Sequence, residues 1–204
     1  TGAVVDPGDI DASGVGVSVA YDGDWIQADI GVTPLGFEII NPVGGLTLRE
    51  KFENGLSVRL TAEQRAITDS VLSYAGVKDA ATGVNYGGVV RSGATLAGDM
   101  DYGRYGAFAS GGFYFVHGDD VESNKKLEAN VGGFVRLVET PDEDLKIGLN
   151  LTYFGYEKNL GQFTFRHGGY FSPEDFVGLS VPVEYARREG RLSYRAGGAV
   201  GLSY

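Results

Sequence analysis

The sequence predicts an all-β protein whose strands form an antiparallel, up-and-down sheet, and three observations lead to this fold class. Apolar residues alternate with polar or small ones at a period of two in many segments, which places side chains on the two faces of an extended strand. Short and long connections follow one another in turn. No apolar run approaches the roughly 18 residues that a membrane-spanning helix needs, so helical membrane proteins are excluded.

The strands can be placed one by one from the alternation. Near the N-terminus Val15, Val17 and Val19 alternate with glycine, serine and alanine, and equivalent patterns follow along the chain. A link at 63–74 permits a short helix, and no other stretch shows convincing helical spacing. We predict about ten strands, at 14–21, 25–33, 46–52, 56–63, 88–100, 105–116, 127–138, 145–155, 176–185 and 191–204.

The connections predict how these strands are arranged. Asn54-Gly55 is the clearest two-residue hairpin signal. The short links lie at 22–24, 53–55, 101–104, 139–144 and 186–190, and the long links at 34–45, 64–87, 117–126 and 156–175. Regular alternation of the two kinds is typical of outer-membrane barrels, which have tight periplasmic turns and longer outside loops.

Composition excludes several kinds of chemistry. The 204 residues contain no cysteine and 2 histidines, which rules out disulfides, zinc-thiolate clusters and cysteine nucleophiles and argues against a histidine-built metal site. With 17 basic and 27 acidic residues, the formal charge of -10 has the wrong sign for a nucleic-acid partner. His117 and His167 lie in separate long links, with no nucleophile at a recognisable spacing. We therefore expect no enzyme, no cofactor and no bound metal.

Alternation alone does not tell a soluble sandwich or lipocalin-like barrel, apolar inside, from a membrane barrel, apolar outside. Three features favour the membrane: arginines lie deep within strands, aromatic residues gather near strand ends, and several strands reach the roughly 9–11 residues of a tilted span. The segment 105–116 carries aromatic residues on both faces, so its lipid side cannot be assigned. Phe113 and Phe115 share one face, and Phe108 and Tyr114 share the other.

Several stretches in and around the long links carry a family resemblance. They are Thr33-Pro34-Leu35-Gly36-Phe37, Asp69-Ser70-Val71-Leu72-Ser73-Tyr74-Ala75-Gly76, Gly87-Gly88-Val89-Val90-Arg91, Leu149-Asn150-Leu151-Thr152, Tyr156-Glu157-Lys158-Asn159-Leu160 and Gly168-Gly169-Tyr170-Phe171-Ser172-Pro173. From Gly14 to its end the chain resembles the C-terminal outer-membrane domain of cellulose synthase operon protein C. One departure is Arg166, where the resemblance leads us to expect glycine.

The resemblance implies a β-barrel of about 16 strands in the bacterial outer membrane, which conducts nascent cellulose from the periplasm to the cell exterior. In that family a helical region of the tetratricopeptide type precedes the barrel in the periplasm. The implied partners are therefore a cellulose chain, outer-membrane lipid, the periplasmic helical-repeat region and the synthase complex.

We expect residues 1–204 to be one domain and a segment of a larger barrel, without the periplasmic helical repeats. If the short turns are periplasmic, 14–21 runs inward and 191–204 runs outward, so both ends lie outside. An odd number of strands must then be missing at each end, and about three on each side would reach the family number. The alternative is that the alternation ending at Tyr204 marks the last strand of an outer-membrane protein, with Tyr204 its true terminus.

Two sets of residues are candidates for function. Polar residues predicted to face inward form a mixed-charge pore lining suited to an uncharged polymer: Gln27, Asp29, Arg49, Arg59, Arg91, Asp99, Asn130, Arg136, Asn150, Glu184 and Arg195. An aromatic link is the candidate gate, and it contains Phe163, Phe165, His167, Gly168, Gly169, Tyr170 and Phe171. The alternatives are that the charges pair across strands and stiffen the wall, and that the link is a lid packed for stability alone.

Three functions therefore remain open from the sequence. The leading hypothesis is an exporter of cellulose. The others are a non-specific porin or structural outer-membrane barrel, and a soluble carbohydrate-binding β-domain that keeps its aliphatic stripes inside. A requirement for detergent and heat-modifiable gel migration would separate the soluble domain from the other two, and secreted cellulose after gene deletion would separate the exporter from the porin.

Overall fold

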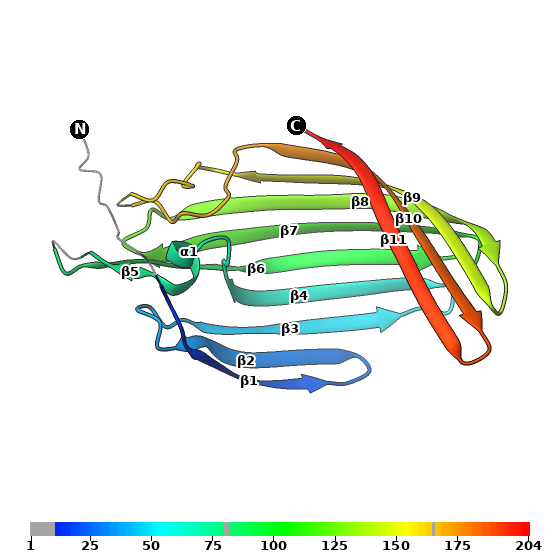
Figure 1. The fold of residues 1–204 in the computed structure, drawn as a ribbon, viewed down its shortest axis with the longest axis horizontal. Helices are drawn as coiled ribbons and strands as arrows, with labels where there is room; N and C mark the ends of the chain where they lie inside the picture. Colours follow the sequence, from blue (N-terminus) through cyan, green and yellow to red (C-terminus); the bar gives the residue numbers. More distant parts are fainter. Residues whose placement is uncertain (1–10, 80–81, 165) are drawn as a thin grey trace.

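The computed structural model describes residues 11–79, 82–164 and 166–204, and these form one curled antiparallel sheet (Figure 1). Its strands are β1 (Val15–Asp22), β2 (Ile26–Leu35), β3 (Pro42–Lys51), β4 (Leu56–Ala66), β5 (Val77–Lys78), β6 (Asn85–Asp101), β7 (Tyr105–Asp119), β8 (Asn124–Glu139), β9 (Glu143–Tyr156), β10 (Phe176–Glu189) and β11 (Leu192–Ser203). A short helix, α1 (Val71–Ala75), lies in the link between β4 and β5.

Each long strand pairs with the next one along the chain. The order across the sheet is β1-β2-β3-β4-β6-β7-β8-β9-β10-β11, and β5 pairs with β6. β1 and β11 lie at the two edges, and over the described residues they are not paired with each other. The predicted all-β, antiparallel, up-and-down fold is confirmed, whereas closure into a larger barrel stays a prediction.

The alternation located the long strands well, and most differences lie where the strands meet the long links. β3 begins at Pro42 instead of 46, and β4 continues to Ala66 instead of ending at 63. The short helix permitted within 63–74 is α1, which begins with a reciprocal capping box. In it the Ser70 hydroxyl oxygen accepts a hydrogen bond from the Ser73 N–H, and the Ser73 hydroxyl oxygen accepts one from the Ser70 N–H.

The strand register defines two faces, because directly opposed residues of an antiparallel pair point to the same side. Phe113 lies opposite Leu127, in the aliphatic rows, and Phe108 lies opposite Asp99. β7, whose faces the sequence left unassigned, is thereby oriented, and Tyr114 shares the side of Phe108 because the two are an even number of residues apart. We call the side of Phe113 the apolar face and the side of Phe108 the polar face.

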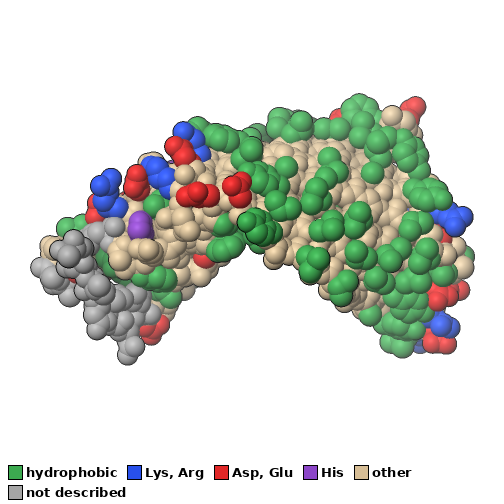
Figure 2. Space-filling view, turned by 90° about the horizontal axis from the view of Figure 1, so that it is seen from above, with side chains coloured by type: hydrophobic (Ala, Val, Ile, Leu, Met, Phe, Trp, Pro, Cys, Tyr) green, Lys and Arg blue, Asp and Glu red, His purple; other side chains and the backbone are tan. Residues whose placement is uncertain are grey.

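Aliphatic side chains on the apolar face are open to the surroundings. Val19 is 71% exposed, Ile30 69% and Leu96 57%. Figure 2 shows hydrophobic side chains spread over the middle of the visible surface and charged side chains gathered toward its two ends. A large exposed apolar surface marks contact with a membrane or a partner, and an apolar band is what outer-membrane barrels present to lipid. The soluble alternative does not fit, because it requires these rows to pack against one another in a dry centre.

Aromatic side chains mark the end of the sheet that carries the short turns. Tyr21 and Trp25 flank the turn between β1 and β2, and Tyr102 and Tyr105 flank the turn between β6 and β7. Each of the four is more than half exposed. Tyrosine and tryptophan are enriched where a membrane meets water, since their rings are apolar and their tips are polar. This end therefore has the girdle that the sequence indicated.

The buried core lies at the opposite end, among the long links. Ile67, Val89, Val116, Leu160 and Tyr170 pack into one cluster. They come from β6, β7, the link that follows β4 and the link between β9 and β10, so these links are folded against the sheet. Over the described part of the chain, no helix combines the length and the apolar character that a membrane crossing demands.

Two glycines allow α1 to lie close against β6. Gly87 has a φ of 99° and Gly88 a φ of 54°, in the left-handed region that glycine adopts without steric penalty. A Cβ at Gly88 would lie 2.5 Å from a side-chain carbon of Ile39, and one at Gly87 would collide with the carbonyl oxygen of Leu72. Larger residues at these two positions would push Ile39 and α1 away from the sheet.

The two faces predict opposite effects for neighbouring substitutions on β8. Val131→Arg should lower the free energy of unfolding in lipid vesicles by about 2–4 kcal/mol, because a guanidinium would enter the hydrocarbon. Asn130 points to the polar face, so Asn130→Arg is the matched control and should have a much smaller effect. Urea titration of the vesicle-inserted proteins measures both. Equal losses for the two variants would contradict the assignment of faces.

Candidate functional site on the polar face

The register puts all the residues predicted to line a pore on the polar face. Arg49 lies opposite Arg59, and Glu184 lies opposite Lys146. The others are Gln27, Asp29, Arg91, Asp99, Asn130, Arg136, Asn150 and Arg195. Their common face is a feature of the structure, and their role as a channel lining stays a prediction.

Ion pairs link several strands of this face near the long links. Arg65 on β4 holds both carboxylate oxygens of Asp29 on β2, at 2.5 and 2.6 Å. Glu63 bridges two cations, with its oxygens 3.2 Å from Arg65 Nε and 3.3 Å from Arg91. A two-pronged contact between arginine and carboxylate is directional as well as attractive. The pairs are partly exposed, so each stabilises the wall by about 0.2–1 kcal/mol.

The network continues across β7 and β8 through an aromatic ring and a lysine. The Arg91 guanidinium lies 4.9 Å from the centre of the Tyr114 ring, and the Tyr114 hydroxyl is 2.5 Å from Thr95 Oγ1. Lys126 Nζ is 2.5 Å from a Glu128 oxygen and 5.2 Å from the centre of the Phe154 ring. Cations over aromatic rings are attracted by the electron-rich face.

Taken together, these groups form a band that carries as many positive as negative charges. We call it the ion-pair belt, and it consists of Asp29, Glu63, Arg65, Arg91, Lys126 and Glu128. Three carboxylates face three cations, so its formal charge is zero. The belt presents hydrogen-bonding groups without a strong field of either sign.

An aromatic cluster lies beside the belt on β9 and β10. The Phe154 and Phe176 rings are stacked at 4.6 Å with 20° between their planes. Phe171, from the link between these strands, approaches both, with ring centres 6.1 Å and 6.4 Å away. A cavity of about 310 Å³ opens here and is lined by Ala66, Ile67, Thr68, Asp69, Arg91, Lys126, Phe154, Tyr156 and Phe171.

A second cavity on the polar face lies nearer the short turns. It holds about 280 Å³ and is lined by Phe108, Gly133, Phe134, Lys146, Gly148, Leu149, Asn150, Pro182 and Glu184. The Phe134 ring is flanked by Arg136 and Lys146, whose cationic centres lie 5.0 and 5.6 Å from its own. Over the described residues Asn150 Oδ1 is buried and has no hydrogen-bond partner. A ligand hydroxyl would satisfy this oxygen, which otherwise carries a desolvation penalty.

Several of these residues were missed from the sequence. Arg65 fell in a predicted link, although it extends the alternation of Arg59, Thr61 and Glu63 by one more step. Lys126 was also placed in a link, whereas β8 begins at Asn124. Continuing the period of two past the predicted strand ends would have found both. Nothing in the sequence alone brings the cluster at Phe154 together.

The predicted gate divides into a buried part and an exposed part. Gly168, Gly169 and Tyr170 are buried. The Tyr170 hydroxyl accepts a hydrogen bond of 3.0 Å from the side-chain amide of Asn124. Phe171 is instead 60% exposed beside the aromatic cluster.

Three other positions of the gate link complete this description. Phe163 is 47% exposed, His167 Nδ1 lies 3.0 Å from Thr164 Oγ1, and Phe165 lies outside the described residues. Arg166, where the resemblance called for glycine, has a φ of 70°, in the region that glycine favours. The local backbone thus keeps a glycine-like shape despite the substitution. A gating role for the link stays a prediction.

Over residues 11–79, 82–164 and 166–204, no group of three or more His, Asp or Glu side chains is placed to hold a metal ion. His117 is exposed on the apolar face, opposite Val90. The expectations of no enzyme, no cofactor and no metal remain predictions.

Burial of Tyr170 predicts a response of the gate link to alkaline pH. Desolvation raises the pKa of Tyr170 to about 12, above the value near 10 of an unfolded tyrosine. The folded state therefore favours the neutral phenol, and this contribution is complete below pH ~10 and is lost as pH rises toward 12. We expect Tyr170 to contribute a loss of about 2 kcal/mol across this window, measured by urea unfolding at each pH. Tyr170→Phe should shrink the loss, and Tyr204→Phe, at a fully exposed site, should not. The same loss in all three proteins would contradict this account.

Comparison with known proteins supports both the fold and the family. A family model described as Cellulose synthase operon protein C C-terminus matches residues 2–204. Cellulose synthase operon protein C of Xanthomonas axonopodis pv. citri is 38% identical over 196 residues, which cover 95% of this chain and 13% of that protein. Cellulose synthase 2 operon protein C of Komagataeibacter xylinus is 40% identical over 192 residues, 94% of this chain and 15% of that protein. The chain thus spans a small part of these relatives.

Among solved structures, the chain is similar to OmpT, an outer membrane protein of Vibrio cholerae. The TM-score is 0.55 at 13% identity, with 92% of this chain and 53% of that chain covered. A loop L8 deletion mutant of OmpT gives 0.50 at 11% identity, with coverages of 92% and 61%. At such identity the likeness shows the fold alone, that of an outer-membrane barrel. With the family match it supports the expected outer-membrane localisation. The chain belongs to the family of the C-terminal domain of cellulose synthase operon protein C, which confirms the resemblance seen in its long links.

Proposed function

We propose that the polar face lines an outer-membrane channel that conducts cellulose from the periplasm to the cell exterior. Membership of the family implies a role in the cellulose synthase system. The observation that carries the proposal is the combination, on one face, of a charge-neutral ion-pair belt with aromatic rings that are exposed or half-buried. The domain needs no catalytic step for this task, because transport requires a lined path instead of a reacting group.

The ion-pair belt suits an uncharged polymer. Cellulose has no charge, so a ring of one sign would attract counterions without holding the glucan, whereas paired charges offer both donors and acceptors. Each carboxylate of the belt already has a cationic partner. A sugar hydroxyl can exchange hydrogen bonds with these groups as it passes, and no unpaired charge is left to trap it.

The aromatic rings suit the apolar face of a sugar ring. One set surrounds Phe154, and the second cavity contains Phe134, which lies opposite Gly148 on β9. Phe154 and Gly148 are six residues apart on one strand, a separation of roughly 20 Å. Sugar rings in transit would stack at both places, and Asn150 Oδ1 would accept a hydroxyl at the second.

Within this channel we assign the gating contact to Phe171 and a fixed support to Tyr170. Phe171 is exposed beside Phe154 and Phe176, and its backbone N–H donates to Asp69 Oδ2 at 2.9 Å. Its ring can therefore rotate while the backbone stays anchored. Tyr170 is 1% exposed, so its movement would require opening the core.

The exporter predicts that aromatic rings of the polar face are needed for secretion. Cells that lack the gene should secrete cellulose when complemented with the full-length wild type, and several-fold less with Phe154→Ala/Phe171→Ala. The matched control is Phe113→Ala/Phe115→Ala, which removes two rings at the same level of the apolar face. Secreted cellulose and the heat-modifiable band of the folded barrel are measured together. Normal secretion without the polar-face rings, from a folded protein, would favour a non-specific porin.

The ion-pair belt predicts opposite shifts in ion selectivity when one of its carboxylates or one of its cations is neutralised. Glu63→Gln leaves a net positive belt and should shift the reversal potential of the full-length protein in planar bilayers toward anions. Arg65→Gln leaves a net negative belt and should shift it toward cations. Both shifts should shrink at high salt, because screening shortens the range of the field. Shifts of the same sign, or none, in folded protein would remove the belt from the conducting path.

A further inference from the structure

The hairpin of β10 and β11 has a charge that differs from the rest of the chain. The protein carries -10 overall. Residues 187–195 nevertheless contain Arg187, Arg188, Arg191 and Arg195 against Glu189. Four of the 17 basic residues therefore gather at one short turn. The neighbouring short turn, at 139–144, is acidic and contains Glu139, Asp142, Glu143 and Asp144.

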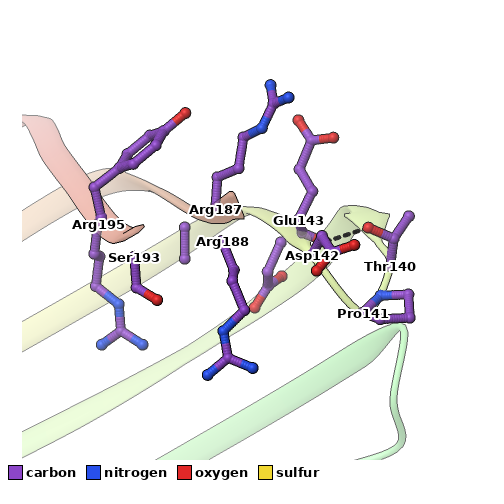
Figure 3. Close-up of a pocket in the computed structure, with 11 residues that line it drawn as sticks. Thr140, Pro141, Asp142, Glu143, Arg187, Arg188, Ser193 and Arg195 are labelled. Atoms are coloured by element: carbon purple, nitrogen blue, oxygen red, sulfur yellow. Dashed lines mark hydrogen bonds between the residues drawn. The ribbon is translucent and has the colours of Figure 1, made fainter. Parts of the chain in front are cut away.

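Two of these arginines share the polar face with a hydroxyl group. Arg188 lies opposite Ser193, and Arg195 lies opposite Ala186. Figure 3 shows the guanidinium groups of Arg188 and Arg195 pointing to the same side with Ser193 between them, while Arg187 points the other way. A cavity of about 330 Å³ lies here between the two turns. The backbone N–H of Arg188 donates to the backbone carbonyl oxygen of Asp142 at 2.8 Å, and this hydrogen bond connects the two turns.

Two of the acidic side chains nearby have partners, whereas over the described residues the two arginines have none. Glu143 accepts a hydrogen bond of 2.9 Å from the Tyr185 hydroxyl. Asp144 lies 3.3 Å from Lys146. In the part of the chain that the structure describes, the guanidiniums of Arg188 and Arg195 make no hydrogen bond or ion pair. In the ion-pair belt on the same face every cation has a carboxylate partner. Within the described ranges, Arg188 and Arg195 therefore differ from the cations of the belt in being unpaired.

We propose that the polar-face side of this hairpin, formed by Arg188, Ser193 and Arg195, is a docking site for an acidic segment of a protein partner. Two planar guanidiniums beside a hydroxyl match carboxylate oxygens, which arginine binds through two parallel hydrogen bonds. The proposal rests on the short turns facing the periplasm, as in the proposed channel, and not on what the channel conducts.

A protein segment fits this surface better than a lipid or a free anion. Arg188 and Arg195 point to the polar face, away from the face assigned to lipid. Both are exposed at the rim, where a small anion would remain largely hydrated, whereas a peptide can reach Arg191 at the tip as well. The acidic turn alongside repels an acidic segment placed one strand away, which restricts the partner to the arginine side.

The test measures binding of a fluorescently labelled peptide of alternating glutamate and glycine to the full-length protein in nanodiscs, by fluorescence anisotropy at low salt. Arg188→Gln/Arg195→Gln should weaken binding by about tenfold or more. Arg187→Gln, on the same hairpin but the opposite face, is the matched control and should bind like wild type. Arg188→Lys/Arg195→Lys keeps the positive charges but removes the planar guanidiniums that bind a carboxylate through two hydrogen bonds, so it should give an intermediate loss of affinity. The same peptide with glutamine for glutamate should not bind.

Other outcomes would overturn the proposal. Equal affinity in all variants would remove these arginines from binding. Full displacement of the peptide by inorganic phosphate at equal concentration would make this a small-anion site, and stronger binding to vesicles of anionic phospholipid would make it a lipid contact. Labelling of a Gly190→Cys variant by an impermeant reagent in intact cells would place the turn outside. These measurements do not involve transport, so they test the docking site even if the proposed export of cellulose is wrong.

Discussion

The register of the antiparallel ladder is the constraint on which the rest of this structure depends. In lipid every backbone N–H and C=O must find a partner within the protein, and strands meet this need by pairing with their neighbours. Because side chains alternate with a period of two, one register assigns every residue of every strand to a face. A slip of one residue would turn Arg65, Arg91 and Lys126 toward hydrocarbon. The apolar and the polar residues of each strand therefore favour the same register.

The polar face shows how charges are accommodated inside such a wall. In the ion-pair belt each cation has a carboxylate partner, and rings such as Tyr114 cover the exposed sides of Arg91 and Lys126. Neutrality is a local arrangement and not a property of the chain, whose net charge is -10. Excess acid lies toward the turns and links, where water solvates it. Both features follow from the low cost of a charge in water and the high cost of an unpaired one elsewhere.

Periodicity predicted the strands and both faces but not the contacts made between distant links. The polar direction of Asp29 or Asn150 follows from alternation alone, whereas β7 was ambiguous because Phe108 and Phe113 have similar character. Only pairing with β6 and β8 resolved it. The burial of Tyr170 depends on Asn124, which is 46 residues away, and no local pattern reports such a contact. Closure of the sheet is likewise a long-range property that strand spacing does not encode.

The long-link end of the sheet is tightly packed, and this limits where the proposed gate can act. At the long-link end Leu160 N–H donates to the Ser172 hydroxyl at 2.8 Å, and Tyr170 and Val89 are buried in one cluster. Moving this link as a unit would expose that cluster and break its hydrogen bonds together, which is slow and costly. Rotation of an exposed side chain needs neither change and occurs on far shorter timescales. The proposed channel, which must admit a continuous polymer, is therefore better gated by the ring of Phe171 than by unfolding of the link that carries it.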